Sequence, residues 1–271
     1  MADSSGRLHV YSVADLTGHL RELGVQEGET LLVQSSARSI GQVEGGTAGI
    51  VAALHAALGP TGTLVVYTAT PENSDTSPLA ALLTDGLDQE KLRAHRATMP
   101  PFDRANTPAS PALGRISEEV RTRAGAVRSA HPQTSFTAIG PRAEELMTDH
   151  QLESHLGERS PTYRLYQAGA RALLVGVPLW CCTAFHLAEY WQPEQVVQRY
   201  GCVITDRRGL RQWVHFDGLK LEIRHFEAMG EMLADRLPGL VTGRLGNAGC
   251  YLLPIRAGVD TAAEWLLGLP R

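Results

Sequence analysis

The stretch TLLVQSSARSIGQVEGGTAGIVAALHAALGPTGTLVVYT, residues 30–68, decides the fold class. It opens with a short apolar run, 30–34, and closes with a second run at 62–68 that is rich in Val and Thr. Between them, 48–59 carries an alanine-rich helical pattern that ends at Gly59. A strand, a helix and a strand in this order form a right-handed crossover with parallel strands. We therefore predict an α/β protein with these two strands in the middle of its sheet.

The sequence on either side continues this α/β pattern. Ser12 can cap an amphipathic helix over 13–24, and Gly24 suits a left-handed stop. Further helices are predicted near 79–95, 111–123, 183–191, 225–236 and 258–267, with strands at 134–140 and 171–178 and in the runs CVITD, QWVHF and GCYLLPI. The chain shows no repeat and no clear linker. We predict one mixed-sheet domain that covers residues 1–271.

Residues 70–112 differ from the rest of the chain. They are rich in Pro, Ser, Thr, Asp and Asn. A long irregular segment inside a compact domain is usually functional. The sequence therefore predicts a loop or lid excursion around 70–110.

Composition and charge exclude several classes of protein. The chain has 271 residues, is 43% hydrophobic and carries a net charge of −4. This charge gives no reason to expect a nucleic-acid partner. The N-terminus has no signal-peptide pattern and no window is apolar enough to span a membrane, so we expect a cytoplasmic protein with its four cysteines reduced.

The loop between the first strand and its helix can bind an anion. Ser35 and Ser36 offer hydroxyls, Arg38 offers charge, and Gly45 and Gly46 let a ligand approach the backbone. The following helix N-terminus favours negative charge. The loop matches neither common phosphate-binding glycine motif, so a plain turn is an equal alternative.

A second candidate is RSAHPQTSFTAIG, residues 128–140. Arg128 and His131 come just before a strand that carries Ser135. An arginine on such a loop can make a forked contact with a phosphate. The alternative is a solvated arginine beside a turn-forming His-Pro pair.

The third candidate is TAFHLAEYW, residues 183–191. His186 and Glu189 are three residues apart and share one face of a helix, and Thr183 lies three residues before the histidine. A carboxylate bonded to an imidazole fixes its tautomer and suits it to act as a general base. The alternative is an ordinary surface His–Glu pair.

Seven motifs in one order give these signals a common meaning. They are Q-S-S, E-G-G-T, F-D-x-x-x-T-P-x-S at 102–110, R-S-x-H-P-x-x-S-F at 128–136, G-E-R-S-P at 157–161, L-L-V-G-V at 173–177 and T-x-x-H-L-A-E-Y at 183–190. Together they resemble the antibiotic N-acetyltransferase family, best known for the aminoglycoside 3-N-acetyltransferases. The resemblance implies that family's fold, acetyl-CoA as the donor, and direct attack of a substrate amine on the thioester.

The resemblance also implies roles for particular residues. His186 falls on the catalytic base, Glu189 on its partner, and Thr183 on the group that steadies the thioester oxygen. The residues expected to bind CoA are Ser35, Ser36, Arg38, Gly45, Gly46, Thr107, Arg128, His131 and Ser135. No metal is expected.

The acceptor is expected to be a primary amine on a small polar molecule, with an aminoglycoside as one candidate. The residues expected to bind it are Tyr67, Glu72, Asp75 and Asp103, with Asp85 and Asp88 as further acidic candidates. A less charged amine would instead meet a more apolar pocket formed by Tyr67, Leu79, Leu82 and Leu83. A homodimer is possible, and no membrane partner is expected.

Some residues depart from the family pattern. Gln34 stands where His is common, and Cys181, Cys182 and Ala184 replace a small polar run. A CoA-binding or effector-binding protein without catalysis therefore remains an alternative. A metal hydrolase and a cysteine acyl-transfer enzyme are weaker alternatives, because the ligand and nucleophile patterns are poor.

Overall fold

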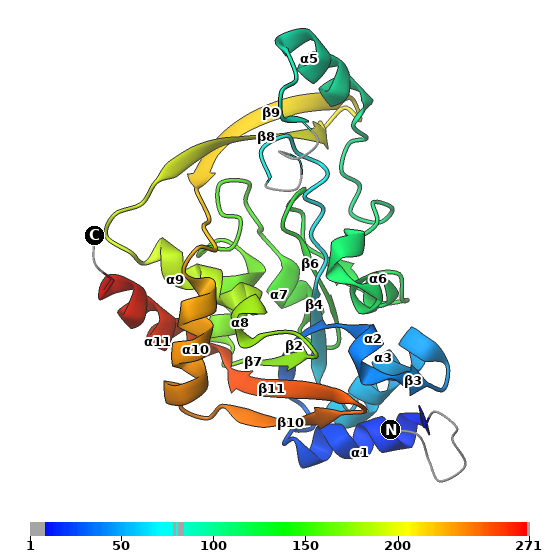
Figure 1. Ribbon diagram of the computed structural model, residues 1–271. Coiled ribbons are helices and arrows are strands. Elements are labelled where there is room, and N and C mark those ends of the chain that lie inside the picture. The colour runs from blue at the N-terminus through cyan, green and yellow to red at the C-terminus, as the bar shows by residue number, and fades with distance from the viewer. Residues whose placement is uncertain (1–8, 78–79, 81–83, 270–271) are drawn as a thin grey trace.

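A seven-stranded mixed sheet forms the centre of the molecule (Figure 1). The computed structural model describes residues 9–77, 80 and 84–269. The strand order is β10 (Val241–Leu245), β11 (Ala248–Pro254), β7 (Arg171–Val175), β2 (Thr30–Ser35), β4 (Thr63–Tyr67), β6 (Phe136–Ile139) and β5 (Val127–Arg128). β7, β2 and β4 run parallel, and the outer strands pair antiparallel. The predicted mixed sheet, with its two parallel strands inside, is confirmed.

Helices cover both faces of this sheet, and one further helix, α5, lies away from it. They are α1 (Val13–Glu22), α2 (Ala37–Ile40), α3 (Gly46–Leu58), α5 (Gln89–Thr98), α6 (Arg115–Arg121), α7 (Ala143–Met147), α8 (Pro161–Gln167), α9 (Leu187–Tyr190), α10 (Phe226–Arg236) and α11 (Ile255–Leu267), with short 3₁₀ turns η1 (Pro111–Leu113), η2 (Leu179–Cys181) and η3 (Thr183–His186). Ser12 caps α1 by accepting a hydrogen bond from Asp15 N at 3.1 Å. Gly24 has a φ of 98° just beyond that helix, so the predicted stop is confirmed.

Alternate side chains of the central strands pack into two separate hydrophobic cores, one on each face of the sheet. Leu31 and Val33 of β2 belong to the core beneath α1, α3 and α6, whereas Leu32 belongs to the core beneath α7 to α11. Successive side chains of a strand point to opposite faces, so a strand covered on both faces is apolar throughout. This explains the continuous apolar run that starts at residue 30.

Two expected helices differ in the structure. The helix expected at 111–123 is interrupted by Gly114, whose φ of 80° ends η1 before α6 begins. The helix expected near 79–95 is shifted, because Asp88 caps α5 by accepting from Lys91 N at 2.9 Å. Residues 78–79 and 81–83 of that range lie outside the described residues.

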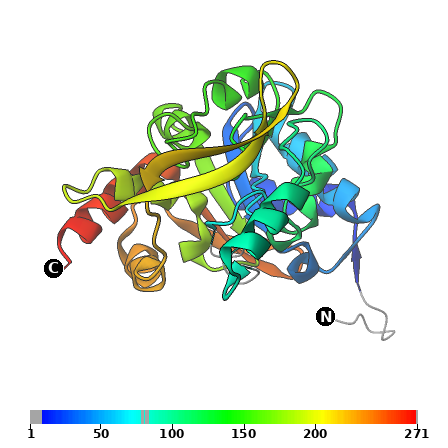
Figure 2. The same ribbon diagram turned by 90° about the horizontal axis from the view of Figure 1, so that it is seen from above.

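The predicted excursion around 70–110 packs against a long antiparallel ribbon, β8 (Val197–Thr205) and β9 (Arg211–Leu219). Figure 1 shows this ribbon beyond the main sheet with α5 at its far end, and Figure 2 shows it crossing the molecule. Asn73 Nδ2 donates to Val203 O at 3.2 Å, and the Arg96 guanidinium lies 4.8 Å from the Trp213 ring centre. The excursion therefore contacts the ribbon at two places, near its start at Asn73 and in α5 at Arg96.

Short pairings complete the structure. β1 (Val10–Tyr11) pairs in parallel with β3 (Gln42–Val43) beside the main sheet. The four cysteines carry free thiols. Within the described ranges, no helix has both the length and the apolar character needed to cross a membrane.

Candidate active site

His186 and Glu189 form a fixed pair where η3 runs directly into α9. His186 Nδ1 lies 2.5 Å from Glu189 Oε2. The other carboxylate oxygen, Oε1, accepts from the backbone N–H of Glu222 at 2.9 Å, and the imidazole packs on the Phe226 ring at 4.5 Å between centres. With Nδ1 occupied and the ring held, Nε2 is the nitrogen that remains for a ligand.

The imidazole borders a cavity of about 320 Å³ at the end of β2. Its walls are formed by Gln34, Ser35, Tyr67, Ala112, Leu113, Ser117, Val177, Trp180, Cys181, Cys182, Thr183, His186, Ile223 and Phe226. A mostly apolar wall with a few convergent polar groups is typical of a small-molecule site. We call this the imidazole cavity.

Thr183 lines the imidazole cavity and is held there by two hydrogen bonds to Gln34. Thr183 N donates to Gln34 Oε1 at 2.8 Å, and Gln34 Nε2 donates to Thr183 Oγ1 at 2.8 Å. The sequence indicated Gln34 only as a departure from a family pattern, and no local signal linked it to a residue 149 positions away.

A second cavity, of about 500 Å³, lies beside the first at the start of α3. Its walls are formed by Ser36, Ala37, Arg38, Gly41, Val43, Gly46, Thr47, Ile50, Gly114 and Arg115. Because Ser35 lines one cavity and Ser36 the other, the two lie near each other at the end of β2. We call the second the anion cavity.

The anion cavity combines backbone donors with two arginines. Gly45 and Gly46 have φ values of 72° and 58°, which turn the chain into a helix of 13 residues. Arg38 and Arg115 are exposed and line the same cavity. No motif pointed to Arg115, because its place beside Arg38 depends on α6 packing near α3 in the folded chain.

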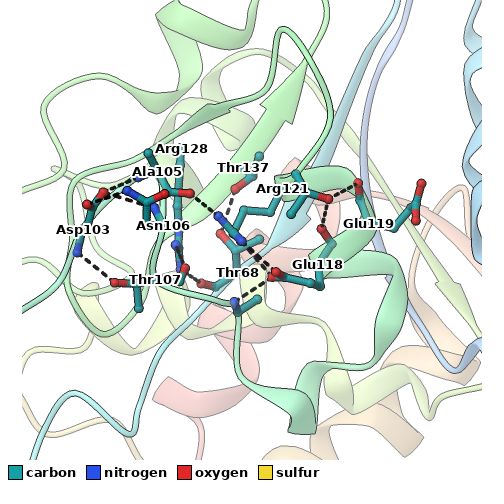
Figure 3. A network of polar contacts seen from close by, with 12 residues as sticks. Thr68, Asp103, Ala105, Asn106, Thr107, Glu118, Glu119, Arg121, Arg128 and Thr137 are labelled. Carbon is teal, nitrogen blue, oxygen red and sulfur yellow. Dashed lines mark hydrogen bonds and ion pairs between the residues drawn. The ribbon is translucent and has the colours of Figure 1, made fainter. Parts of the chain in front are cut away.

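Arg128 lies inside the fold rather than on either cavity. Its Nε donates to Ser135 Oγ at 3.0 Å, its Nη2 donates to Thr68 O at 2.7 Å, and its Nη1 donates to Thr107 O. Figure 3 shows Arg128 beside Thr68 and Thr107. The side chain also stacks over Phe102 and is only 5% exposed. Burial lowers the pKa of Arg128 to about 10. The structure therefore places Arg128, Ser135 and Thr107 in an internal hydrogen-bond network, in which all three guanidinium nitrogens of Arg128 already donate to protein oxygens.

Replacing Arg128 with alanine is expected to lower the free energy of unfolding by about 2–4 kcal/mol, because it leaves buried carbonyl groups without donors. Lysine should restore little of this, since one ammonium group cannot reproduce the fork of the guanidinium. Urea unfolding of both variants measures the effect. Unchanged stability together with much weaker acetyl-CoA binding would instead support the phosphate contact implied by the resemblance.

His131 is also fully enclosed. Its Nδ1 accepts from Gln133 N and Thr134 N, both at 3.1 Å, and its Nε2 donates to Leu152 O at 3.0 Å. The ring is 0% exposed, and burial lowers its pKa to about 4. Both ring nitrogens are therefore used to hold the loop before β6, away from both cavities.

The acidic residues expected to bind the acceptor are dispersed and already bonded. Asp75 is paired with Arg96 at 2.5 Å. Glu72 accepts from Ser110 Oγ at 2.5 Å, and Asp103 accepts from Ala105 N at 2.8 Å within its own turn. Among the residues expected to bind the acceptor, Tyr67 alone borders the imidazole cavity; Asp85 and Asp88 do not border it, and Leu79, Leu82 and Leu83 lie outside the described residues.

Other carboxylates lie close to the His186–Glu189 pair. A cavity of about 250 Å³ adjoins the imidazole cavity, and Glu189, Glu194, Glu222 and Phe226 contribute to its walls. Phe226 also lines the imidazole cavity. Lys220 Nζ lies 2.8 Å from Glu222 Oε1, and this hydrogen bond lowers the pKa of Glu222. The local sequence around Glu222 has no motif, so its place beside the pair could not be predicted.

In the described part of the chain, no group of three or more His, Cys, Asp or Glu side chains is arranged to hold a metal ion.

The fold and site define a class of protein. The central strand β2 of a mixed α/β sheet ends between two cavities, one beside the N-terminus of α3 and one bordered by the His186–Glu189 pair. The family model for aminoglycoside 3-N-acetyltransferase matches residues 32–267. The chain belongs to the aminoglycoside 3-N-acetyltransferase family.

Individual relatives agree with this assignment. The YokD protein of Bacillus subtilis (strain 168), an aminoglycoside N(3')-acetyltransferase-like protein, is 32% identical over 93% of this chain and 91% of its own. Its crystal structure superposes with a TM-score of 0.89, covering 96% of this chain and 94% of that chain at 31% identity. The structure of AAC-IIIb with CoASH gives a TM-score of 0.82 at 26% identity, covering 97% and 100% of the two chains.

Aminoglycoside N(3)-acetyltransferase III of Salmonella sp is 42% identical over 174 residues. That match covers 64% of this chain and only 58% of the length of the Salmonella protein. The identity over this shared part supports the family assignment.

Proposed function

We propose that this chain transfers the acetyl group of acetyl-CoA to an amine of a small polar molecule, with His186 as the general base. The observation that carries the proposal is the contact between His186 Nδ1 and Glu189 Oε2, which leaves Nε2 for the imidazole cavity. The family membership and the relative solved with CoASH support acetyl-CoA as the donor.

In the proposed reaction, the amine nitrogen attacks the thioester carbonyl carbon and its proton passes to His186 Nε2. Glu189 stabilises the imidazolium that forms, because its carboxylate stays bonded to Nδ1. The Thr183 hydroxyl donates a hydrogen bond to the thioester oxygen as negative charge develops there. The carbon–sulfur bond then breaks, the proton on His186 passes to the CoA thiolate, and the amide leaves.

The anion cavity is the proposed site for the phosphates of CoA. Its helix N-terminus, Arg38 and Arg115 favour negative charge, and it lies near the imidazole cavity, since Ser36 lines the first cavity and Ser35 the second. The pantetheine arm would then run from one cavity into the other. This arrangement keeps Ser35, Ser36, Arg38, Gly45 and Gly46 as proposed cofactor residues and adds Arg115.

Replacing Arg38 and Arg115 together with alanine is expected to raise the KM for acetyl-CoA about 10–100-fold, since each charge-assisted hydrogen bond contributes about 1.5–3 kcal/mol at most and both arginines are exposed. The KM for the amine should change little. Steady-state kinetics at increasing salt concentration measures both constants. An unchanged KM for acetyl-CoA would exclude the anion cavity as the phosphate site.

The proposed acceptor is the 3-amino group of an aminoglycoside, as the name of the Salmonella relative states for that protein. Such acceptors carry several positive charges. Glu189, Glu194 and Glu222 line the cavity next to the imidazole cavity, which Glu72, Asp75 and Asp103 do not, and they outnumber the two cations there, Lys220 and Arg224, which both pair with Glu222. Screening by salt should therefore weaken acceptor binding.

The experiment is an acetyl-CoA turnover assay with a panel of aminoglycosides beside simple aryl and alkyl amines, with and without a chelator. Turnover of an aminoglycoside supports the proposal in full. Turnover of other amines alone would leave acetyl transfer standing and remove the aminoglycoside. Binding of acetyl-CoA without turnover of any amine would favour a CoA-binding protein without catalysis.

We propose further that the chain acts in the cytoplasm on small molecules, without nucleic-acid or membrane partners, as one domain over 1–271. The net charge of −4 supports the absence of a nucleic-acid partner. Whether two copies form a homodimer is decided by light scattering of the purified protein.

A further inference from the structure

The side chain of Gln34 connects the central strand to the turn that carries Thr183. It is half-buried near the end of β2, where it pairs in register with Leu174 of β7. Its Nε2 donates to Cys181 O at 2.9 Å and to Thr183 Oγ1 at 2.8 Å, and its Oε1 accepts from Thr183 N at 2.8 Å. One amide therefore makes three hydrogen bonds to η2 and η3.

The partners of this amide fix its orientation. The backbone N–H of Thr183 requires an oxygen, and the backbone carbonyl of Cys181 requires an N–H. A flipped amide would place donor against donor and acceptor against acceptor. The nitrogen of Gln34 must therefore face Thr183 Oγ1.

The orientation of the amide decides what the Thr183 hydroxyl can do. An amide NH₂ group only donates, so Thr183 Oγ1 accepts from Gln34 and keeps its own proton. Within the described residues no recorded acceptor takes that proton. The hydroxyl is thus a donor that points from a fixed position on the wall of the imidazole cavity.

We propose that Gln34 is a positioning residue that keeps the Thr183 proton available for the carbonyl oxygen of the acetyl donor. The proposal rests on the acetyl transfer proposed above. Donation from Nε2 also polarises the hydroxyl, because hydrogen bonds in a chain strengthen one another. Gln34 then supports the transition state, where charge develops on that oxygen, through a residue it touches rather than by touching the substrate.

The decisive variant is Gln34→Glu, which keeps the size of the side chain and can keep the bond from Thr183 N. A carboxylate accepts only, so the bond to Cys181 O is lost, as it also is in Gln34→Met, and the bond to Thr183 Oγ1 reverses and consumes the proton. We expect kcat to fall about 100-fold, as for the loss of one donor to a developing oxyanion, and the KM for acetyl-CoA to stay within about 3-fold. Gln34→Met removes the amide without providing an acceptor, so its kcat should fall less.

A double-mutant cycle tests whether Gln34 acts through Thr183. In a Thr183→Val background, Gln34→Glu should cause almost no further loss of kcat. The single variant Thr183→Ser keeps the hydroxyl and should retain most of the wild-type kcat. Losses that multiply independently would overturn the proposal. So would a Gln34→Glu enzyme with kcat within about 3-fold of wild type, or a Gln34→Met enzyme as impaired as Gln34→Glu.

Binding of a ketone analogue, in which CH₂ replaces the thioester sulfur of acetyl-CoA, separates this proposal from acetyl transfer itself. Wild type should bind the analogue about 3–10-fold more tightly than CoA through the hydrogen bond to its carbonyl, and Gln34→Glu should lose this preference. Such a result without turnover of any amine would remove the proposed function and keep the role of Gln34. If the wild-type enzyme bound the analogue and CoA equally well, the proposed role of Gln34 would be overturned.

A matched control adds the same charge away from the site. Gln167 is exposed at the end of α8, so Gln167→Glu should change neither kcat nor the preference for the analogue. Unfolding midpoints and CoA affinity, measured for every variant, show that the comparison is made between folded proteins. A loss of CoA binding in Gln34→Glu equal to its loss of kcat would assign Gln34 a purely structural role and overturn the proposal.

Discussion

Replacing His186 with alanine is expected to lower kcat about 10²–10⁴-fold, the usual effect of losing a general base. An amine must lose a proton as it attacks the thioester, and among the described residues that line the imidazole cavity only this imidazole is held by a carboxylate. The variant should still bind CoA, because the anion cavity is formed by other residues. Turnover and CoA affinity, measured separately, check the two halves of this expectation.

Two further variants sharpen this result. Glu189→Gln should lower kcat less than His186→Ala, because an amide can still hold Nδ1 but no longer stabilises the imidazolium. His55→Ala is the matched control: His55 lies in the last turn of α3, nine residues from the start of that helix at the anion cavity, and should leave turnover unchanged. Wild-type turnover in His186→Ala would exclude this histidine as the base.

The part of the fold that could be predicted from sequence is the part with local causes. β2, α3 and β4 follow from apolar runs and a helical pattern within residues 30–68, and α1 follows from its cap at Ser12. β5 and β10 could not be predicted, because they are short and owe their conformation to the neighbouring strand. Tertiary pairing, not intrinsic preference, decides such strands.

The same distinction applies to the site. His186 and Glu189 lie three residues apart, so their contact could be read from helical spacing. The spacing of Arg128 and His131 also suggested function, but whether they face a ligand or the core depends on burial, which no motif records. Gln34 and Arg115 act through residues distant in sequence, and only the folded chain brings them to the cavities.

Stability is expected to fall steeply as the pH drops from about 6.5 toward 4. His131, His150 and His155 are buried, and their rings contact one another with centres 4.8 Å and 4.5 Å from His131. Burial lowers the pKa of His131 to about 4, and burial and the neighbouring rings lower the pKa values of His150 and His155. Below pH 6.5 the unfolded chain therefore binds protons that the folded chain excludes, so the stability present above this pH is lost. For His131 alone the loss by pH 4 is about 3 kcal/mol.

His155→Phe tests this account most directly. His155 Nε2 is buried without a hydrogen-bond partner, and the ring packs against Tyr200 and Phe216, so a phenyl ring can occupy its place without losing a bond from that nitrogen. Removing one proton site should reduce the slope of unfolding free energy against pH by up to about 1.4 kcal/mol per pH unit between pH 6.5 and 4.5. Urea unfolding across this range measures the slope, and the exposed His9, changed to Phe, should leave it unaltered. A wild-type stability that stays flat between pH 6.5 and 4.5 would show that these histidines accept protons in the folded chain.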